Sequence, residues 1–138
     1  GLVKKIGYKK YIINPSNRIH DLDLLPRPAR HLVNMEGYFK IGAFHSAKSR
    51  SNRVLSVMCS RGCPEKCTFC TTPQMWGQNT RWRSTNHIMD EILNDVREYK
   101  IGEIQFDDDT ITVNKKNLYF YILNINFLVI HLFKKIQK

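Results

Sequence analysis

The hydrophobic pattern between residues 54 and 106 changes period twice and predicts two strands with a helix between them. Val54–Met58 is an apolar run of strand length. Residues 85–100 follow Ser84, a good N-cap. Their apolar side chains recur at helical spacing, at Ile88, Ile92, Leu93, Val96 and Tyr99. Glu103–Phe106 alternates as a second strand, after a glycine, Gly102, expected to end the helix in the left-handed conformation. This order forms a βα unit whose two strands are parallel.

The N-terminal part predicts an arm. Tyr8–Ile13 and Ile19–Leu25 have the composition of short extended stretches. Between them Asn14–Asn17 is a turn signal containing a proline. We therefore expect a hairpin-like arrangement around that turn.

The next segment predicts a connector. Pro26 and Pro28 disfavour regular structure and favour an extended chain. Residues 29–38 are expected to form a helical turn or two, and residues 40–53, rich in glycine and serine, an exposed loop. Residues 1–53 together are expected to be a connector or arm rather than a packed domain.

The C-terminal segment, residues 118–138, has a biased composition. Eighteen of its twenty-one residues are Phe, Ile, Asn, Tyr, Lys or Leu. The apolar run Leu118–Phe133 is interrupted by Asn and His and is shorter than the about 20 residues of a transmembrane helix. We expect a divergent, low-complexity tail and no association with a membrane.

The net charge of +10 lies mostly outside the central segment. Residues 1–53 hold eleven Lys and Arg against three Asp and Glu, residues 54–117 hold eight against nine, and residues 118–138 hold three against none. Nucleic-acid binding would favour a basic stripe interleaved with aromatic side chains. The scattered charge argues against a nucleic-acid partner.

All four cysteines lie within residues 59–70. Neighbours this close suit metal ligation better than a disulfide framework and indicate a reducing compartment. No apolar segment of a signal peptide follows the basic N-terminus. The expected location is the cytoplasm.

Cys63, Cys67 and Cys70 have C-x3-C-x2-C spacing, which suits one loop wrapping an iron–sulfur cluster. Three thiolates leave one iron of a four-iron cluster without a protein ligand, so that a small molecule can bind there. The alternative is a zinc site with Cys59 as the fourth ligand. No second C-x2-C pair or ligand histidine accompanies the motif, which favours the cluster.

The cysteine motif, with Phe69 before the last cysteine, resembles the cluster loop of the radical S-adenosylmethionine (SAM) enzymes. Arg81-x-Arg-Ser84 and Phe106-x-Asp-Asp-Thr110, with the connector motifs Asp21–Ala29 and Met35–Phe39, resemble the branch that usually carries a cobalamin-binding domain. The resemblance covers roughly residues 11–117.

The resemblance implies a fold class, α/β, with a partial TIM-type parallel βα barrel. Residues 54–117 would supply the N-terminal part of the radical SAM domain, its first one to two βα units. A full barrel needs on the order of 250 residues and this chain has 138, so we expect a truncated piece without the cobalamin domain.

The resemblance also implies cofactor contacts. Cys63, Cys67 and Cys70 would hold a 4Fe-4S cluster, the backbone of Phe69 would meet the adenine of SAM, and Asp108 or Asp109 would face its methionine amino group. Cys59 is expected to be a buried thiol and not a ligand. Arg81 and Arg83 are expected to be solvated side chains at the start of the helix.

The implied reaction is reductive cleavage of SAM to methionine and a 5′-deoxyadenosyl radical, which abstracts hydrogen from a substrate; in this branch a methyl transfer often follows. The implied partners are a one-electron donor such as flavodoxin or ferredoxin and a small-molecule substrate that the sequence does not identify. The use of cobalamin stays open. The alternative function is a non-catalytic module that carries electrons through an iron–sulfur cluster or binds zinc.

Overall fold

The computed structural model describes residues 3–14, 17–42 and 49–124. It has a mixed α/β fold with three small two-stranded sheets. β3 (Val54–Val57) pairs in parallel with β6 (Glu103–Phe106), with Val54 opposite Glu103 and Val57 opposite Phe106. This confirms the predicted pair of parallel strands. No closed barrel occurs in these residues.

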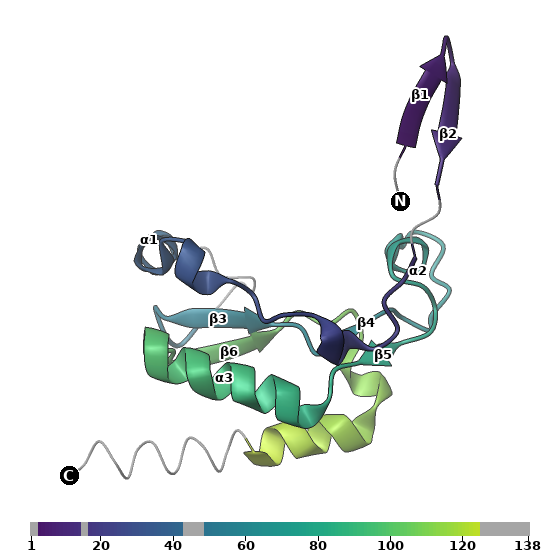
Figure 1. The fold of residues 1–138 in the computed structure, drawn as a ribbon. Helices are drawn as coiled ribbons and strands as arrows, with labels where there is room; N and C mark the ends of the chain where they lie inside the picture. The colour runs from purple at the N-terminus through teal and green to yellow at the C-terminus, as the bar shows by residue number, and fades with distance from the viewer. Residues whose placement is uncertain (1–2, 15–16, 43–48, 125–138) are drawn as a thin grey trace, which may run out of the picture.

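The helix between the paired strands, α3 (Thr85–Tyr99), begins and packs as predicted. The Ser84 side chain accepts a hydrogen bond from the His87 backbone N–H, which caps the first turn. Ile88 is fully buried and Ile92 is 2% exposed, because both lie on the face turned toward β3 and β6 (Figure 1). Val96 and Tyr99 continue this face and are partly buried against the core.

The end of α3 differs from the prediction. The left-handed residue is Lys100, with φ 52° and ψ 45°, rather than Gly102. Gly102 is needed for space instead, since a Cβ there would stand 2.4 Å from the Ser51 hydroxyl oxygen. The backbone N–H of Gly102 donates to the Arg53 carbonyl oxygen at 2.9 Å, which brings the chain to the start of β6.

The predicted arm is a hairpin, but its turn lies earlier in the chain. β1 (Val3–Gly7) and β2 (Lys10–Ile13) pair antiparallel around Tyr8 and Lys9, where Lys9 has φ 55°. All residues of both strands are exposed, and the hairpin stands away from the rest of the molecule (Figure 1). Asn14 and Asn17 are not at its tip, and residues 15–16 between them lie outside the described residues.

The connector after the hairpin contains two short 3₁₀ helices, η1 (Leu22–Leu24) and η2 (Arg30–Leu32), and the helix α1 (Met35–Ile41). The prediction of an extended stretch over Ile19–Leu25 is therefore wrong for the residues of η1. The Asp21 side chain caps this helix by accepting a hydrogen bond from the Asp23 backbone N–H. Leu22 is 1% exposed. The predicted helical turns after Pro28 are confirmed by η2 and α1. Within the predicted loop 40–53, residues 43–48 lie outside the described part.

The first residues of the predicted tail, 118–124, are described by the structure, and Tyr121 among them enters the core. After the 3₁₀ helix η3 (Ile111–Val113), residues 115–124 are helical. Tyr121 is fully buried, and its ring lies 6.2 Å from that of Phe106 on β6. Residues 125–138, most of the predicted tail, lie outside the described residues. No helix in the described part is long and apolar enough to cross a membrane.

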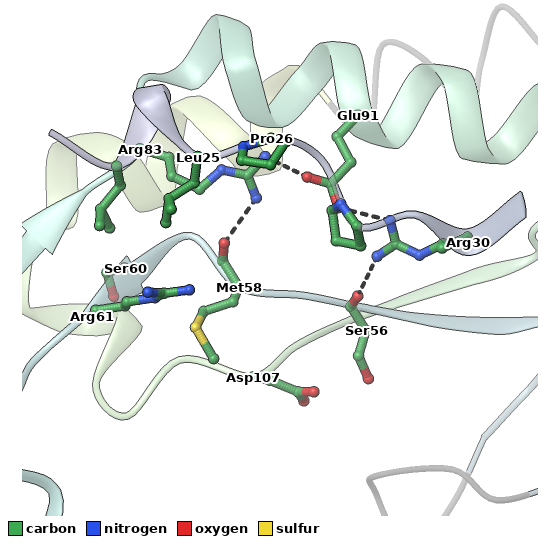
Figure 2. A pocket seen from close by; sticks show the side chains of 12 residues that line it. Leu25, Pro26, Arg30, Ser56, Met58, Ser60, Arg61, Arg83, Glu91 and Asp107 are labelled. Carbon is green, nitrogen blue, oxygen red and sulfur yellow. Dashed lines mark hydrogen bonds and ion pairs between the residues drawn. The ribbon is translucent and has the colours of Figure 1, made fainter. Parts of the chain in front are cut away.

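The free edge of β3 is covered by a buried ionic group that we name the arginine clamp, formed by Arg30, Arg83 and Glu91. The Val57 carbonyl accepts from the Asp107 N–H on the β6 side, so the Ser56 and Met58 carbonyls face the opposite edge. Arg30 donates to the Ser56 carbonyl at 3.1 Å and Arg83 to the Met58 carbonyl at 3.0 Å (Figure 2). Both guanidinium groups pair with the Glu91 carboxylate.

The clamp joins three segments that are distant in sequence. Arg30 comes from η2 in the connector, Arg83 precedes α3, and Glu91 is 1% exposed on α3. Arg30 also pairs with Asp95 on α3 at 2.9 Å. Because the carboxylates lie between α3 and the strand edge, the clamp attaches the connector to the βα unit and blocks the pairing of another strand with β3.

We expect Glu91→Ala to lower the free energy of unfolding by about 3–5 kcal/mol, because Arg83 loses its carboxylate partner and Arg30 keeps that of Asp95 alone. Chemical denaturation followed by circular dichroism measures this change. The matched control is Glu98→Ala, an exposed acid on the same helix, for which a loss within about 0.5 kcal/mol is expected. Equal losses in the two variants would contradict the role assigned to the clamp.

The connector also touches the N-terminus of α3 through Asp23, which accepts from the Ser84 backbone N–H at 2.8 Å and lies 3.1 Å from the His87 ring nitrogen. Slight burial alone would raise the pKa of Asp23, but the hydrogen bonds from Ser84 and the contact with His87 lower it below the ordinary 3.8. A lowered pKa means that this contact stabilises the fold above pH 3.8 and is lost as the pH falls through the folded-state value.

Asp23→Asn should therefore cost about 0.3–1 kcal/mol near neutral pH, the usual value of a negative charge at a helix N-terminus. The difference from the unmodified chain should shrink below pH 3.8. Urea unfolding at a series of pH values measures it, with Asp90→Asn, an exposed carboxylate on α3, as the control. A difference that stays constant down to acid pH would refute the stabilising charge.

Candidate functional site

The cysteines lie on a long loop whose two ends are held together. β4 (Ser60–Arg61) pairs antiparallel with β5 (Arg81–Trp82), with Ser60 opposite Trp82 and Arg61 opposite Arg81. Residues 62–80 form the loop between them, which contains the short helix α2 (Thr72–Met75). The loop therefore leaves the sheet just beyond the C-terminal end of β3 and returns directly to α3 (Figure 1).

The first cysteine is fixed by its backbone. Gly62 has φ 108°, and a Cβ there would stand 2.7 Å from the Asn79 carbonyl oxygen, so the two limbs of the loop approach only because this residue is glycine. The Cys63 N–H donates to the Gly77 carbonyl at 3.2 Å. The Thr80 hydroxyl donates to the Gly62 carbonyl at 3.3 Å.

The three motif cysteines differ in their surroundings. Cys63 is buried, and its sulfur lies 3.1 Å from the Thr110 hydroxyl, which follows β6. Cys67 is exposed and Cys70 is half-buried, with the Cys70 N–H donating to the Cys67 carbonyl at 3.2 Å. All three are free thiols.

Three free thiols on residues 63–70 are a donor set that suits an iron–sulfur cluster. Their side chains are not gathered around one point, however. Among the described residues no three His, Cys, Asp or Glu side chains are arranged to hold a metal ion. Cys67 and Cys70 would have to turn toward Cys63 for all three thiolates to bind one cluster.

Cys59 has a different environment from the other cysteines. It is fully buried in the hydrophobic core, as expected for an apolar role. Burial, and after it the nearby Asp108 carboxylate, strongly raises the pKa of the Cys59 thiol. Because metal ligands are thiolates, this neutral thiol is poorly suited to be a fourth ligand.

Asp108 joins the ends of the two parallel strands. Its two carboxylate oxygens accept from the Cys59 backbone N–H, each at 3.1 Å, and one of them also accepts from the Ser60 hydroxyl. Burial raises the pKa of Asp108, although the hydrogen bonds from Ser60 and Cys59 oppose that effect. The carboxylate is thus engaged by the first residues beyond β3.

Asp109 and Phe69, the other predicted SAM contacts, are both open to solvent. Asp109 is exposed, and its carboxylate accepts from the Thr72 hydroxyl at 3.1 Å. The Phe69 side chain is 89% exposed on the cysteine loop. Their predicted roles toward SAM remain predictions, but both lie on segments that leave the same end of the β3–β6 pair.

The arginines of the Arg81-x-Arg-Ser84 motif are not the solvated side chains that we expected. Arg81 donates to the carbonyl oxygens of Ile19 and Trp76, the latter at 2.7 Å, and Arg83 belongs to the arginine clamp. Both arginines bind backbone carbonyl oxygens of other segments. For this reason they are structural side chains and not solvated ones.

Sequence reasoning also missed Glu91. The signal was available, because Glu91 and Asp95 are acids beside the apolar positions of a predicted core-facing helix, where a carboxylate needs a cationic partner.

A cavity of about 190 Å³ lies between the connector and the outer edge of β3. Figure 2 shows that the arginine clamp borders it, together with Leu25 and Pro26 of the connector and Arg61 at the start of the cysteine loop. Most of its polar groups already bind one another. The cavity is a small space beside the clamp and not an open substrate site.

Several known proteins are similar in sequence to more than half of this chain. It is 47% identical over 92 residues to the cytidylyl-2-hydroxyethylphosphonate methyltransferase of Streptomyces wedmorensis, covering 67% of this chain and 17% of that protein. It is 35% identical over 102 residues to an uncharacterized methyltransferase of Pyrococcus horikoshii, covering 74% and 20%. It is 31% identical over 78 residues to the hopanoid C-2 methylase of Rhodopseudomonas palustris, covering 56% and 15%.

The chain thus spans no more than 20% of the length of these three relatives. No protein-family profile matches it, and no solved structure matches it. The relatives are B12-binding radical SAM methyltransferases. With the cysteine loop at the end of β3 and the acidic segment at the end of β6, these similarities show that the chain belongs to the radical SAM enzymes, with relatives in the B12-binding methyltransferase branch.

Proposed function

We propose that this chain carries the cluster loop and part of the SAM-binding surface of a B12-dependent radical SAM methyltransferase. The observation that carries the proposal is the position of the cysteine loop. It begins at the end of β3, and the neighbouring parallel strand β6 ends beside it in Asp107–Asp109. In parallel βα folds, site residues gather at the carboxyl ends of adjacent strands.

Cys63, Cys67 and Cys70 would hold the 4Fe-4S cluster. When bound, such a cluster supplies a single electron for the cleavage of SAM. Cys63 is already held near Thr110 through the loop neck, whereas Cys67 and Cys70 lie on the outer part of the loop. The chain thus offers one buried thiol and two more exposed ones, which would have to turn toward it to bind the same cluster.

Asp108 is a positioning residue in this proposal. It accepts hydrogen bonds from Cys59 and Ser60, and so holds the start of the loop against the end of β6. Asp109 is the better candidate for the SAM amino group, because its carboxylate is exposed and accepts from the Thr72 hydroxyl, whereas the Asp108 carboxylate already binds Cys59 and Ser60. An ammonium beside it would form a charge-assisted hydrogen bond.

We propose methyl transfer as the reaction because the relatives are named methyltransferases or methylases. The first acts, by its name, on a cytidylyl phosphonate and another on a hopanoid, so the substrate is not shared among them. The relatives are several times longer than this chain, and the complete reaction would require the parts they have beyond the shared segment. A small-molecule substrate, cobalamin and a one-electron donor such as flavodoxin or ferredoxin are therefore proposed for the complete enzyme.

Anaerobic reconstitution with iron and sulfide tests the ligand set. Cys63→Ala, Cys67→Ala and Cys70→Ala should each lose most of the iron–sulfur absorption and bound iron, while Cys59→Ala should keep them, because its thiol is buried and neutral. Iron and sulfide analysis of the same samples gives the stoichiometry. Loss of the cluster in Cys59→Ala but not in the other variants, or a colourless protein that binds zinc, would refute the three-thiolate site.

SAM binding distinguishes an enzyme from an electron carrier. Adding SAM to the reduced, reconstituted chain should change its electron paramagnetic resonance spectrum. Asp109→Asn should weaken the apparent affinity about tenfold, the usual effect of losing one charge-assisted hydrogen bond. Asp90→Asn, an exposed carboxylate on α3, is the matched control. A well-formed cluster whose spectrum ignores SAM would favour the electron-transfer module.

A further inference from the structure

A cluster of three arginines surrounds Trp76, between the connector and the segment after the cysteines. We name it the Trp76 cluster, formed by Arg18, Arg61, Arg81 and Trp76. The Arg61 guanidinium lies over the Trp76 ring, 4.8 Å from its centroid. Arg81 donates to the Trp76 carbonyl at 2.7 Å, and Arg18 donates to the Gln74 carbonyl at 3.3 Å.

The Trp76 cluster lacks a negative partner among the described residues. In the part of the chain that the structure describes, no carboxylate pairs with any of the three guanidinium groups. This contrasts with Arg30 and Arg83, whose charges are balanced by Glu91. Burial, together with the like charges of Arg18 and Arg61, lowers the pKa of Arg81, so the three charges lie close enough to repel one another.

The cluster borders a hollow of about 430 Å³. Arg18, His20, Trp76 and Arg81 line it, with Gln78 and Asn79, whereas Arg61 lies beside Trp76 without lining the hollow, and no Asp or Glu lines it. Such a volume lies within the range of small-molecule sites, and its lining combines cations, polar amides and one aromatic ring.

The backbone allows the charges to be this close. Gly77 has φ 91°, and a Cβ there would stand 2.8 Å from a terminal nitrogen of Arg18. A side chain at this position would push the Arg18 guanidinium away from the hollow. Arg18 and Arg81 use only some of their five N–H donors on backbone carbonyls, which leaves donors for a ligand.

From this arrangement we propose that the hollow beside Trp76 binds a phosphate or diphosphate group of a small ligand. Guanidinium groups match phosphate oxygens through paired N–H donors, and a dianion would remove the repulsion among the three arginines. Because Arg18 and His20 come from the connector and the rest from the segment after the cysteines, a bound phosphate would tie these two segments together.

A small ligand explains the geometry better than a nucleic acid. Arg18 and Arg81 line one hollow that has a single tryptophan, whereas a strand of RNA or DNA is bound along a basic groove with several stacking side chains. Neither the cysteines nor Asp108 and Asp109 line the hollow, so this site is separate from the proposed cluster and SAM contacts.

Tryptophan fluorescence tests the proposal on the full chain. The sequence has two tryptophans, so Trp82→Phe leaves Trp76 as the sole reporter. Inorganic pyrophosphate should change the Trp76 emission saturably at constant ionic strength. Arg18→Gln and Arg81→Gln in this background should each bind it about tenfold more weakly, since both arginines line the hollow and each variant removes a charge-assisted contact. Circular dichroism checks that each variant is folded, and either variant alone suffices for the test.

The matched control is Arg97→Gln, which removes one exposed positive charge at the end of α3. It should bind pyrophosphate like the parent. Uridine diphosphate identifies the source of the phosphate: tighter binding than pyrophosphate indicates a nucleotide ligand, and equal binding a phosphate ester without a base contact. The proposal is overturned if pyrophosphate leaves the emission unchanged, if Arg97→Gln weakens binding as much as Arg18→Gln, or if an RNA oligonucleotide binds tightly while pyrophosphate does not.

Discussion

The buried carboxylate of Glu91 is the interaction on which the arrangement of this chain depends. It lies on α3 and pairs with Arg30 from the connector and with Arg83 from the segment after the cysteine loop. Each arginine also binds a carbonyl on the free edge of β3. A buried ion pair alone is weak support for stability, because both charges must leave water. Here the guanidinium groups also satisfy strand carbonyls that have no neighbouring strand, so the clamp replaces a missing hydrogen-bond ladder.

The clamp also fixes where the site can form. With one edge of β3 covered, only the β6 side continues the sheet, and both strands point their carboxyl ends at the cysteine loop. The loop is then held from three directions: by the β4–β5 pair at its neck, by Asp108 from β6, and by the close approach of Gly62 to Asn79. The outer part of the loop, with Cys67 and Phe69, has few such contacts and is exposed. The base of the loop is thus held by several contacts, and its outer part is open to solvent.

Two groups of arginines in this fold have opposite electrostatic environments. In the clamp the charges are buried and neutralised by carboxylates, which is the usual condition for a structural ion pair. Around Trp76, Arg18 and Arg81 border a hollow, and in the described part of the chain the three guanidinium groups have carbonyl and aromatic partners without a carboxylate. Structural roles account for the first group completely. They account for the second only in part, because no carboxylate of the described residues offsets the repulsion among its charges.

The sequence by itself determined the local elements. Ser84 and the apolar spacing of Ile88 and Ile92 placed α3, and the two apolar runs placed β3 and β6 in parallel, because caps and periodicity act over a few neighbouring residues. The cysteine spacing likewise predicted the family to which the chain belongs. Only the tertiary structure decided the pairing of Arg30 with Glu91, 61 positions apart, the tie between Asp108 and Cys59, and the burial of Tyr121. These contacts depend on which surfaces the topology brings together. The position of a polar side chain in the sequence does not indicate which distant residue it will contact. The end of α3 was likewise decided by a distant contact. Gly102 packs against Ser51 of another segment, and the left-handed residue after the helix is Lys100.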